Sequence, residues 1–337
     1  MFADDTNIFV AGNNENVVYS KANKLLDELN LYMLSNQLHI NTEKCVYMHF
    51  RPNYNHDERR NCARAKIVGS EHQLFVHNNK IKKTNMARFL GIVIDEDLNW
   101  DGHLEHLEQK LKSSIITIKR IKKFIPQEHF SKLYHSLFVS HLTYGISAWG
   151  SAPSYKLKKI FSIQKRCMRL LFGKQLNFDH AEYYKTCART RSIDEYLAPR
   201  NYVLEHTKPL FTEHKLLTVY NLHKIFLLNE IYKIRKYRYP ISLFNFLNNA
   251  PESLRNSQVN NILLPHYYLN NSRHQFLYCG ISIWNKINNK AALQGNIFSS
   301  DLSMSSCSAK RKFKEILLSL QSSGDNENWE KQNFNFE

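Results

Sequence analysis

Three amphipathic stretches between residues 101 and 173 place the strongest limit on how this chain folds. In the first, apolar side chains recur every three or four positions, at Leu104, Leu107, Leu111, Ile115, Ile118 and Ile121. The stretches HFSKLYHSLFVSHLTYGISAW and KLKKIFSIQKRCMRLLFG repeat this spacing, and the last of them ends at Gly173. Such spacing is typical of helices with one buried face. The sequence therefore predicts a bundle of three consecutive helices in a domain of residues 99–175.

The first 98 residues follow a different pattern, in which short strand candidates are mixed with one helix. Helical spacing predicts a helix over about residues 15–36. Three runs predict strands, namely one that carries Cys45, Tyr47 and His49 on one face, QLFVHN, and ARFLGIVIDE. The polar stretch NYNHDERRNCARAK is typical of an exposed loop. This order predicts an α+β unit over residues 1–98.

The remaining residues, 176–337, are expected to form a mostly helical C-terminal region. HKIFLLNEIYKIRKYRY and SAKRKFKEILLSLQSS have helical patterns, and the sequence between them is rich in Asn and has no clear period. We therefore expect two helices separated by irregular, Asn-rich stretches.

The charge is unevenly distributed and indicates a polyanionic partner. The chain has 46 Lys and Arg against 30 Asp and Glu, a net charge of +16. Residues 1–100 are neutral, with 12 of each kind, whereas residues 101–175 have 14 basic and 4 acidic residues. Nucleic acid is the simplest partner for such a basic block. A membrane surface is the competing partner, but no lipidation motif supports it.

Nothing in the sequence directs the chain to a membrane or to secretion. No apolar run approaches the roughly 18 residues of a membrane helix, and residues 1–30 have no signal-peptide pattern. The six cysteines are scattered and form no C-x-x-C pair, which suits a reducing compartment. The expected location is intracellular, in the nucleus, the cytoplasm or both.

Two adjacent carboxylates, Asp4 and Asp5, lie between apolar runs in the opening MFADDTNIFV. Asp favours turns, whereas Phe, Ile and Val favour strands, so the stretch predicts a hairpin with both acids at its tip. Paired carboxylates are suitable ligands for a hard cation such as Mg²⁺. The alternative is a surface hairpin with an acidic tip.

The order of motifs resembles the rear half of the reverse transcriptases of jockey-like non-LTR retrotransposons. F-A-D-D-T is followed by a helix, an N-x-x-K strand, FLGIVID and D-x-x-L-x-W. The later segments LYHSLFVSHLTYGISAWGS, IQKRCMRLLFG and RHQFLYCGISIWNKI resemble the region after the polymerase in such elements. The likeness extends from residue 2 to about residue 317, and it implies part of a polymerase palm, with a short antiparallel sheet and a helix, followed by a helical thumb.

The resemblance also implies roles for individual residues. Asp4 and Asp5 would belong to a site for Mg²⁺ or Mn²⁺, and Phe2 would lie beneath the incoming nucleotide. Lys44 would approach the leaving pyrophosphate, or it is an ordinary surface lysine. The Phe89-Leu90-Gly91 segment would support the primer end, or it is a core strand with a glycine turn. The implied partners are an RNA template and the RNA–DNA duplex.

The family has fingers, a first palm strand with a further metal-binding Asp, and in some members an endonuclease domain, none of which has a counterpart in this sequence. We expect a truncated RNA-directed DNA polymerase that is inactive alone and that would need the missing upstream half as a partner. A copy truncated at its 5′ end and a gene model begun at an internal Met both account for this. The alternative functions are a non-catalytic module that binds RNA or RNA–DNA, and a relic without function.

Basic residues on the predicted helices are the candidate phosphate contacts of the thumb. They are Lys119, Arg120, Lys122, Lys123, Lys165, Arg166 and Arg169. In a thumb they would follow the phosphate backbone without reading sequence. Some of the first group could instead complement the dipole at a helix C-terminus. His103 and His106 share a helix face, but without a third ligand they are expected to be surface histidines.

Overall fold

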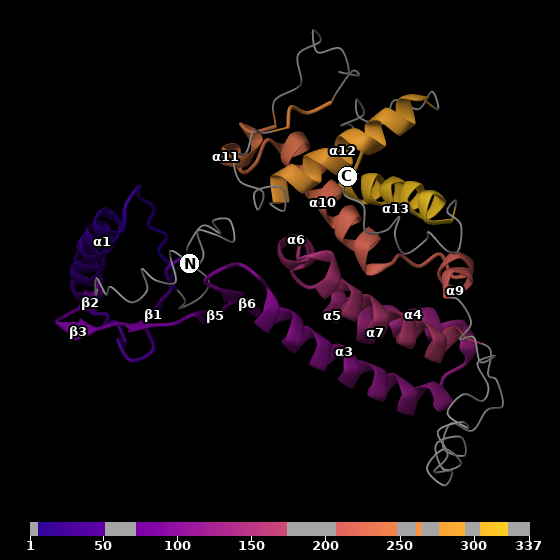
Figure 1. Ribbon diagram of the computed structural model, residues 1–337, viewed down its shortest axis with the longest axis horizontal. Coiled ribbons are helices and arrows are strands. Elements are labelled where there is room, and N and C mark those ends of the chain that lie inside the picture. The colour runs from indigo at the N-terminus through magenta and orange to yellow at the C-terminus, as the bar shows by residue number, and fades with distance from the viewer. Residues whose placement is uncertain are drawn as a thin grey trace, which may run out of the picture. The chain divides into compact units, whose positions relative to one another are not determined.

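The computed structural model describes residues 6–50, 72–173, 207–247, 261–264, 276–293 and 304–322. The chain divides into two compact units, Met1–His103 and Leu104–Glu337. Figure 1 shows strands only in the first and mainly helices in the second. The α+β class predicted from the sequence is confirmed. The three-domain division at residues 98 and 175 stays a prediction.

The first unit contains one long helix and three two-stranded ladders. Helix α1 (Glu15–Ser35) begins where the Asn14 side chain accepts a hydrogen bond from the Val17 N–H. Strand β1 (Val46–Tyr47) pairs in parallel with β4 (Lys82–Lys83), whereas β2 (Phe75–Val76) with β3 (Asn79–Lys80), and β5 (Met86–Phe89) with β6 (Ile92–Asp95), pair antiparallel. The sheet structure is therefore not purely antiparallel.

The core of this unit lies between α1 and the first two ladders. It consists of the buried side chains of Tyr19, Ala22, Leu74, Val76 and Ile81. The Tyr19 ring stacks on His72 with centroids 4.9 Å apart. The side chain of Asn23 donates to the Gln73 carbonyl and accepts from the Phe75 N–H, which fixes α1 to the beginning of β2.

Both antiparallel hairpins turn through two residues with positive φ. His77 and Asn78 have φ values of 50° and 60°, and Leu90 and Gly91 have values of 46° and 81°. Two successive positive values are typical of the tight turns that match strand twist. Consequently QLFVHN and ARFLGIVIDE are not continuous strands, because each contains or enters a turn.

Only part of the hairpin predicted at the start of the chain lies within the described residues. Asp4, Asp5 and Phe2 lie outside the described residues. Residues 8–10, expected as its second strand, belong to no strand, since none of the described strands pairs with them. The Ile8 and Phe9 side chains are instead exposed. The second arm of the predicted hairpin is therefore wrong in the described part.

The second unit consists of helices and short helical turns. They are α3 (Asp101–Ile121), η1 (Lys122–Phe124), η2 (Gln127–His129), α4 (Phe130–Tyr134), the π-helical turn η3 (His135–Val139), α5 (Ser140–Thr143), α6 (Ile146–Trp149), α7 (Ser154–Phe172), α9 (Lys208–Glu213), α10 (Val219–Tyr237), α11 (Ile241–Phe244), α12 (Phe276–Leu293) and α13 (Ser306–Ser322). In the described ranges, no helix is both long enough and apolar enough to span a bilayer.

The second predicted helix of the bundle is broken rather than continuous. Its first part ends at Thr143, before the extended Tyr144, and α6 begins after Gly145, whose φ of 62° is disfavoured for residues with a Cβ. The buried indole of Trp149 donates to the Tyr144 carbonyl at 2.8 Å and so closes the corner. A Cβ on Gly150 would lie 2.5 Å from Cδ2 of His223 on α10, so this position needs a glycine. The Tyr-Gly-x-x-x-Trp motif is thus explained by a helix corner.

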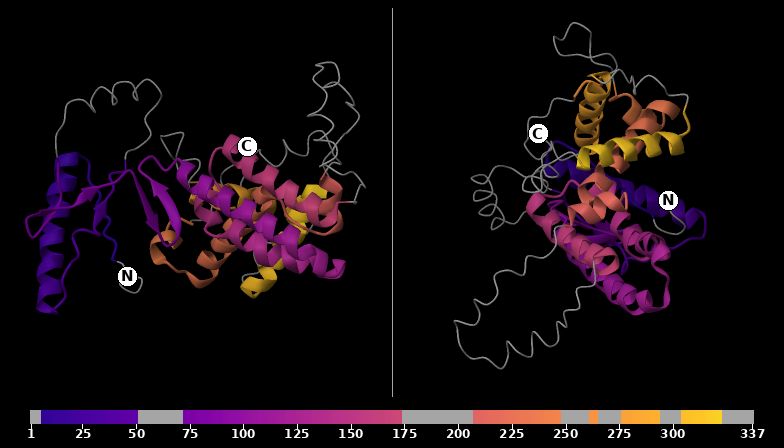
Figure 2. Two further views of the ribbon diagram at one scale, coloured as in Figure 1. Left: turned by 90° about the horizontal axis from the view of Figure 1, so that it is seen from below. Right: turned by 90° about the vertical axis from the view of Figure 1, so that its right-hand side faces the viewer.

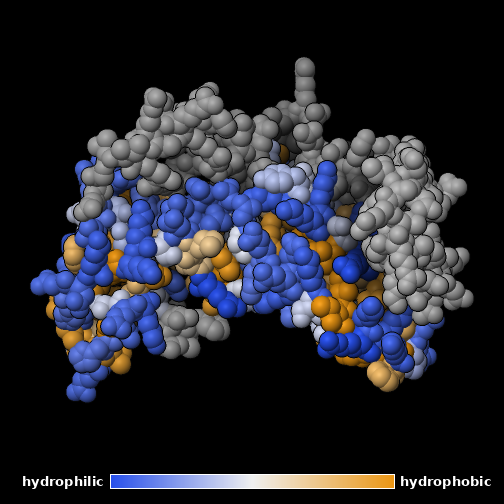
Figure 3. Space-filling model, turned by 60° about the horizontal axis from the view of Figure 1, so that its bottom comes forward, coloured by the Kyte–Doolittle hydropathy of each residue, from blue (hydrophilic) through white to orange (hydrophobic). Residues whose placement is uncertain are grey.

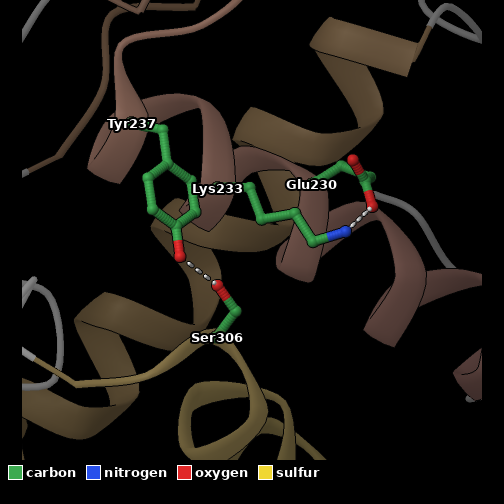
Figure 4. A network of polar contacts seen from close by, with 4 residues as sticks. All are labelled: Glu230, Lys233, Tyr237 and Ser306. Carbon is green, nitrogen blue, oxygen red and sulfur yellow. Dashed lines mark hydrogen bonds and ion pairs between the residues drawn. The ribbon is translucent and has the colours of Figure 1, made fainter.

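Helix α10 is the centre of the C-terminal part and packs against α12 and α13, as Figures 1 and 2 show. The Tyr232 and Trp284 rings both meet Phe313 edge-on, with centroids 6.3 and 6.1 Å apart. At the end of α10, the hydroxyls of Tyr237 and Ser306 are 3.3 Å apart (Figure 4). These contacts make α10 and α13 antiparallel neighbours.

Helix α12 forms in the stretch that was expected to be irregular. Its Asn side chains explain the composition, because they bind backbone and side chains outside the helix. Asn285 accepts from the Ile262 N–H at 2.9 Å and donates to the Ile262 carbonyl at 2.8 Å. Asn288 donates to Asn261 at 2.9 Å. The Asn content therefore marks tertiary hydrogen bonds here and not only loop.

Candidate nucleic-acid interface

The two predicted clusters of basic residues meet because α3 and α7 end side by side. The Lys122 ammonium, just after α3, donates to the carbonyl of Leu170 in the last turn of α7 at 2.6 Å. The two helices lie next to one another in both Figure 1 and Figure 2. Since one helical turn rises about 5.4 Å, cations within a turn of this contact lie at the same end of the bundle.

We name this group the basic end, and define it as Lys119, Arg120, Lys123, Arg166 and Arg169. Four of these side chains are exposed, and Arg169 is half-buried. Carboxylates are absent from the whole of α7 and from residues 109–127. A solvated helix face usually mixes both signs, so an unbalanced group of cations indicates an anionic partner.

Other cations of the second unit are partly neutralised within the protein. Lys112 pairs with Glu108 at 2.6 Å on α3. On α10, Lys233 pairs with Glu230 at 2.8 Å, as Figure 4 shows. These two positions carry less net positive charge than Lys119, Arg120, Lys123 and Arg166, which make no ion pair in the described residues, and this makes the basic end the better phosphate site.

Lys122 itself has a structural role that differs from the expected phosphate contact. Its ammonium lies 5.2 Å from the centre of the Phe130 ring in addition to its bond to Leu170. Burial lowers the pKa of this lysine. A cation at the C-terminal carbonyls of a helix stabilises that helix, which here is α7, whereas the sequence suggested this role at the end of α3 itself.

Lys165 is also placed partly against the protein. Its ammonium is 4.9 Å from the centre of the Phe161 ring, and the side chain is half-buried. Its aliphatic stem therefore covers apolar surface while the charge stays near water. Because it lies against Phe161, Lys165 does not belong to the basic end.

Two positions to which the family resemblance gave roles are exposed in the first unit. Leu90 is 45% exposed at the tip of the β5–β6 hairpin, beside Gly91 and after Phe89. Lys44 follows a turn in which the Asn41 side chain accepts from its N–H at 3.3 Å, and its own side chain is exposed. Both side chains are exposed, whereas the candidate catalytic groups, Asp4 and Asp5, lie outside the described residues. Their proposed roles stay predictions.

The metal site proposed at Asp4 and Asp5 lies outside the described residues. No group of three or more metal-ligating side chains occurs in the ranges that are described. Two adjacent carboxylates match the oxygen preference of Mg²⁺ or Mn²⁺. By themselves they are too few to hold two such ions in fixed positions.

The D-x-x-L-x-W motif and the histidine that follows it have structural roles. Both carboxylate oxygens of Asp95 accept backbone N–H groups, from Asn99 at 2.7 Å and from Trp100 at 2.8 Å. His103, expected at the surface, is in fact 4% exposed, and its Nδ1 accepts from the Val93 N–H. Its burial follows from packing beside β6, which spacing along a helix does not show.

Sequence reasoning missed two further features of the basic end. Phe124 is 85% exposed directly after Lys123. His214 stacks on Phe172, the last residue of α7, with centroids 4.0 Å apart, and its neighbours in the chain are the exposed Glu213 and Lys215. A large aromatic residue within a run of cations was the available signal for Phe124, whereas the placement of His214 depends on tertiary packing.

Comparison with known proteins supports the resemblance to reverse transcriptases. The sequence is 23% identical to the RNA-directed DNA polymerase from mobile element jockey of Drosophila melanogaster over 201 residues, which are 58% of this chain and 19% of the relative. It is 20% identical over 103 residues, 30% of this chain and 11% of the relative, to the probable RNA-directed DNA polymerase from transposon X-element of the same fly. The chain is therefore similar in sequence to RNA-directed DNA polymerases of mobile elements.

This relationship confirms the resemblance to reverse transcriptases at the level of class. No protein-family model and no solved structure matches the chain. The chain spans about a fifth of the length of the jockey polymerase and about a tenth of the X-element polymerase.

Proposed function

We propose that this chain is the palm–thumb portion of a non-LTR retrotransposon reverse transcriptase, and that its basic end holds the phosphates of an RNA–DNA duplex. The observation that carries the proposal is the junction of α3 and α7, where the Lys122–Leu170 contact gathers Lys119, Arg120, Lys123 and Arg166 from two segments, residues 109–127 and α7, that contain no carboxylate. The names of the two relatives support the choice of nucleic acid over a membrane surface.

The proposed contacts are to phosphates and not to bases. Lys119, Arg120 and Lys123 project from the end of one helical segment, and Arg166 projects from the exposed face of another. Charges on rigid helices follow a phosphate backbone but make no pattern of donors matched to base edges. The interface is therefore expected to bind duplexes of any sequence with similar affinity.

For catalysis we propose that Asp4 and Asp5 bind Mg²⁺ or Mn²⁺ only together with further palm carboxylates from the rest of a polymerase. Phe2 and Lys44 would then lie near the nucleotide, and Phe89, Leu90 and Gly91 near the primer end. When bound, the metals would activate the primer hydroxyl and stabilise the leaving pyrophosphate. Residues 1–337 alone are expected to be inactive, because one carboxylate pair does not fix two metals.

Two measurements test these proposals. In primer extension on poly(rA)/oligo(dT) with Mg²⁺ or Mn²⁺, the chain should incorporate no more nucleotide than its Asp4→Ala, Asp5→Ala variant. Incorporation above this control would show that the chain is a complete polymerase.

For the duplex, fluorescence anisotropy with a labelled RNA–DNA hybrid should show affinity that falls steeply with salt, with a log–log slope of roughly −0.7 to −0.9 per phosphate contact. Changing Lys119, Arg120, Lys123 and Arg166 to Gln should weaken binding and flatten this slope. A matched control removes four exposed cations elsewhere, at Lys21, Lys80, Lys83 and Arg311. If both variants bind alike, only net charge matters and the basic end is not the site.

A further inference from the structure

Phe124 presents an aromatic ring to solvent at the basic end. Its side chain is 85% exposed, the highest value among the large apolar residues described, and Figure 3 shows apolar side chains reaching the surface in separate patches. It ends η1, after which the chain becomes extended at Ile125, with φ −115° and ψ 131°. Pro126 follows and prevents a direct continuation of the helix.

The neighbouring contacts hold this ring outward. Lys122 is directed inward to the Leu170 carbonyl and the buried Phe130 ring. The Ile125 N–H donates to the Lys122 carbonyl at 3.4 Å and closes the η1 turn. The backbone on both sides of Phe124 is therefore fixed, while its ring is left without protein cover.

The surroundings of Phe124 favour nucleic acid over a protein partner. Docking of a protein onto an apolar residue normally uses a contiguous apolar patch with a polar rim. Here Lys123 precedes the ring, and Gln127 and Glu128, which follow Pro126, are exposed and polar. A single ring beside several cations matches a ligand that offers an aromatic face and phosphates together.

We propose that Phe124 stacks on an unpaired base of a single-stranded nucleic acid whose phosphates are held by the basic end. This inference rests on the proposed function for the class of partner, and it adds that the partner has a single-stranded segment at this point. Bases within a duplex are stacked on one another and offer no free face except at the ends. Stacking on one aromatic residue depends little on base identity.

The experiment compares a single-stranded 12-mer of rU, whose bases stack little on one another, with a blunt 12-base-pair RNA–DNA hybrid by fluorescence anisotropy, using the full chain. Phe124→Ala should weaken binding of the single strand by about 5- to 100-fold, and leave hybrid affinity and the salt slope unchanged. Phe124→Trp should retain the affinity, and its added indole fluorescence should be quenched by the single strand. Phe124→Leu, which stays apolar without a ring, should behave like Phe124→Ala.

Ile116→Ala is the matched control, because Ile116 is also an exposed apolar residue, at 54%, on α3. It should bind both ligands as the unaltered chain does. Unchanged single-strand binding in Phe124→Ala overturns the inference and leaves the ring as a candidate protein contact. Equal losses for both ligands also overturn it, since the ring would then support the site without stacking.

The two proposals fail in different ways. If the basic end is not the duplex site, the four-Gln variant binds the hybrid like its matched control. If Phe124 is not a stacking residue, hybrid binding still depends on the basic end, but the single strand is not sensitive to position 124.

Discussion

Gln164 on α7 and Gln321 on α13 bind alternate backbone groups of one short segment, residues 216–219, that leads into α10. Gln321 donates to the Leu216 carbonyl at 3.1 Å and accepts from the Thr218 N–H at 3.3 Å. Gln164 donates to the Leu217 carbonyl at 3.0 Å and accepts from the Val219 N–H at 2.8 Å. Each amide thus satisfies the segment as a neighbouring strand would, and all these groups are buried.

Replacing Gln164 by Leu should therefore destabilise the second unit by about 2–4 kcal/mol, because a buried N–H and a buried carbonyl lose their partners. Urea unfolding followed by circular dichroism measures the change. Ser162→Ala, at an exposed position on the same helix, is the control and should have little effect. A loss below 0.5 kcal/mol in Gln164→Leu would mean that water replaces the amide.

Gly150→Ala should destabilise the corner between α6 and α7 by about 1–3 kcal/mol. The added Cβ would lie 2.4 Å from the Ile146 carbonyl oxygen and 2.5 Å from Cδ2 of His223, and the carbonyl is backbone that does not swing away. Thermal unfolding tests this against Ala148→Ser, a change at an exposed position of α6. Equal melting temperatures for the two variants would contradict the close approach.

His223 should make folding sensitive to acid. Burial, with a contribution from Lys224, lowers its pKa from 6.5 to about 3. Below pH 6.5 the imidazole of His223 takes up a proton in the unfolded chain but not in the folded chain. The contribution of His223 to the free energy of unfolding is therefore complete above pH 6.5 and is lost as the pH falls towards 3. The loss is about 1.4 kcal/mol per pH unit.

The check is the urea midpoint at pH 7.5 and 5.5 for the unaltered chain and for His223→Gln. Between pH 7.5 and pH 5.5 the urea midpoint should decrease less in His223→Gln than in the unaltered chain. In the control His135→Gln, at an exposed position, the midpoint should decrease as much as in the unaltered chain. Parallel pH profiles in all three would show that other groups cause the acid sensitivity.

Lys122 and Lys123 are adjacent but should respond in opposite ways to substitution by Met. Lys122→Met removes the cation at the Leu170 carbonyl and should reduce stability by about 1–2 kcal/mol, with a small effect on binding of RNA–DNA. Lys123→Met should leave stability unchanged and weaken binding, since its side chain is exposed. Urea denaturation measures the stability of both variants, and fluorescence anisotropy measures their binding of RNA–DNA. If Lys122→Met weakens binding and Lys123→Met does not, the phosphate contact is made by Lys122.

Asp95→Ala should loosen the connection before α3. The carboxylate accepts the Asn99 and Trp100 N–H groups, and it holds Leu98 and Trp100 at φ values of 54° and 64°. Removing two hydrogen bonds to a charged group should cost about 2–3 kcal/mol in the first unit, and relaxation of the two positive φ values would offset only part of this loss. Faster amide exchange at Asn99 and Trp100 would report it, and exposed Asp97→Ala is the control that should not change them.

The sequence predicted the regular parts of this fold and missed the parts that depend on distant contacts. Helical spacing found α1, α3, α7, α10 and α13, because each buries one face. It did not find the corner at Gly145, since the apolar period of the helix continues across it. It also missed α12, because the Asn side chains that suggested loop are used in hydrogen bonds to Ile262 and Asn261.

The candidate site shows the same division. The sequence alone shows the excess of Lys and Arg on α3 and α7, and it shows that few Asp or Glu residues lie near them in the chain. That Lys122 is directed inward, or that Phe124 is directed outward, depends on where the Leu170 carbonyl lies in space. Lys122 and Lys123 are neighbours in the chain and look equivalent in the sequence. The packing of the two helix ends directs only Lys122 inward and leaves Lys123 exposed.

The amide contacts of Gln321 also bear on the order of folding. Gln321 and Leu216 are 105 residues apart in the chain, whereas the β2–β3 and β5–β6 hairpins join residues that are close neighbours in sequence. Closing so long a loop costs more entropy than forming a hairpin. During synthesis the Leu216 carbonyl and the Thr218 N–H therefore lack this partner until α13 has left the ribosome, whereas Gln164, which is made earlier, can already bind Leu217 and Val219.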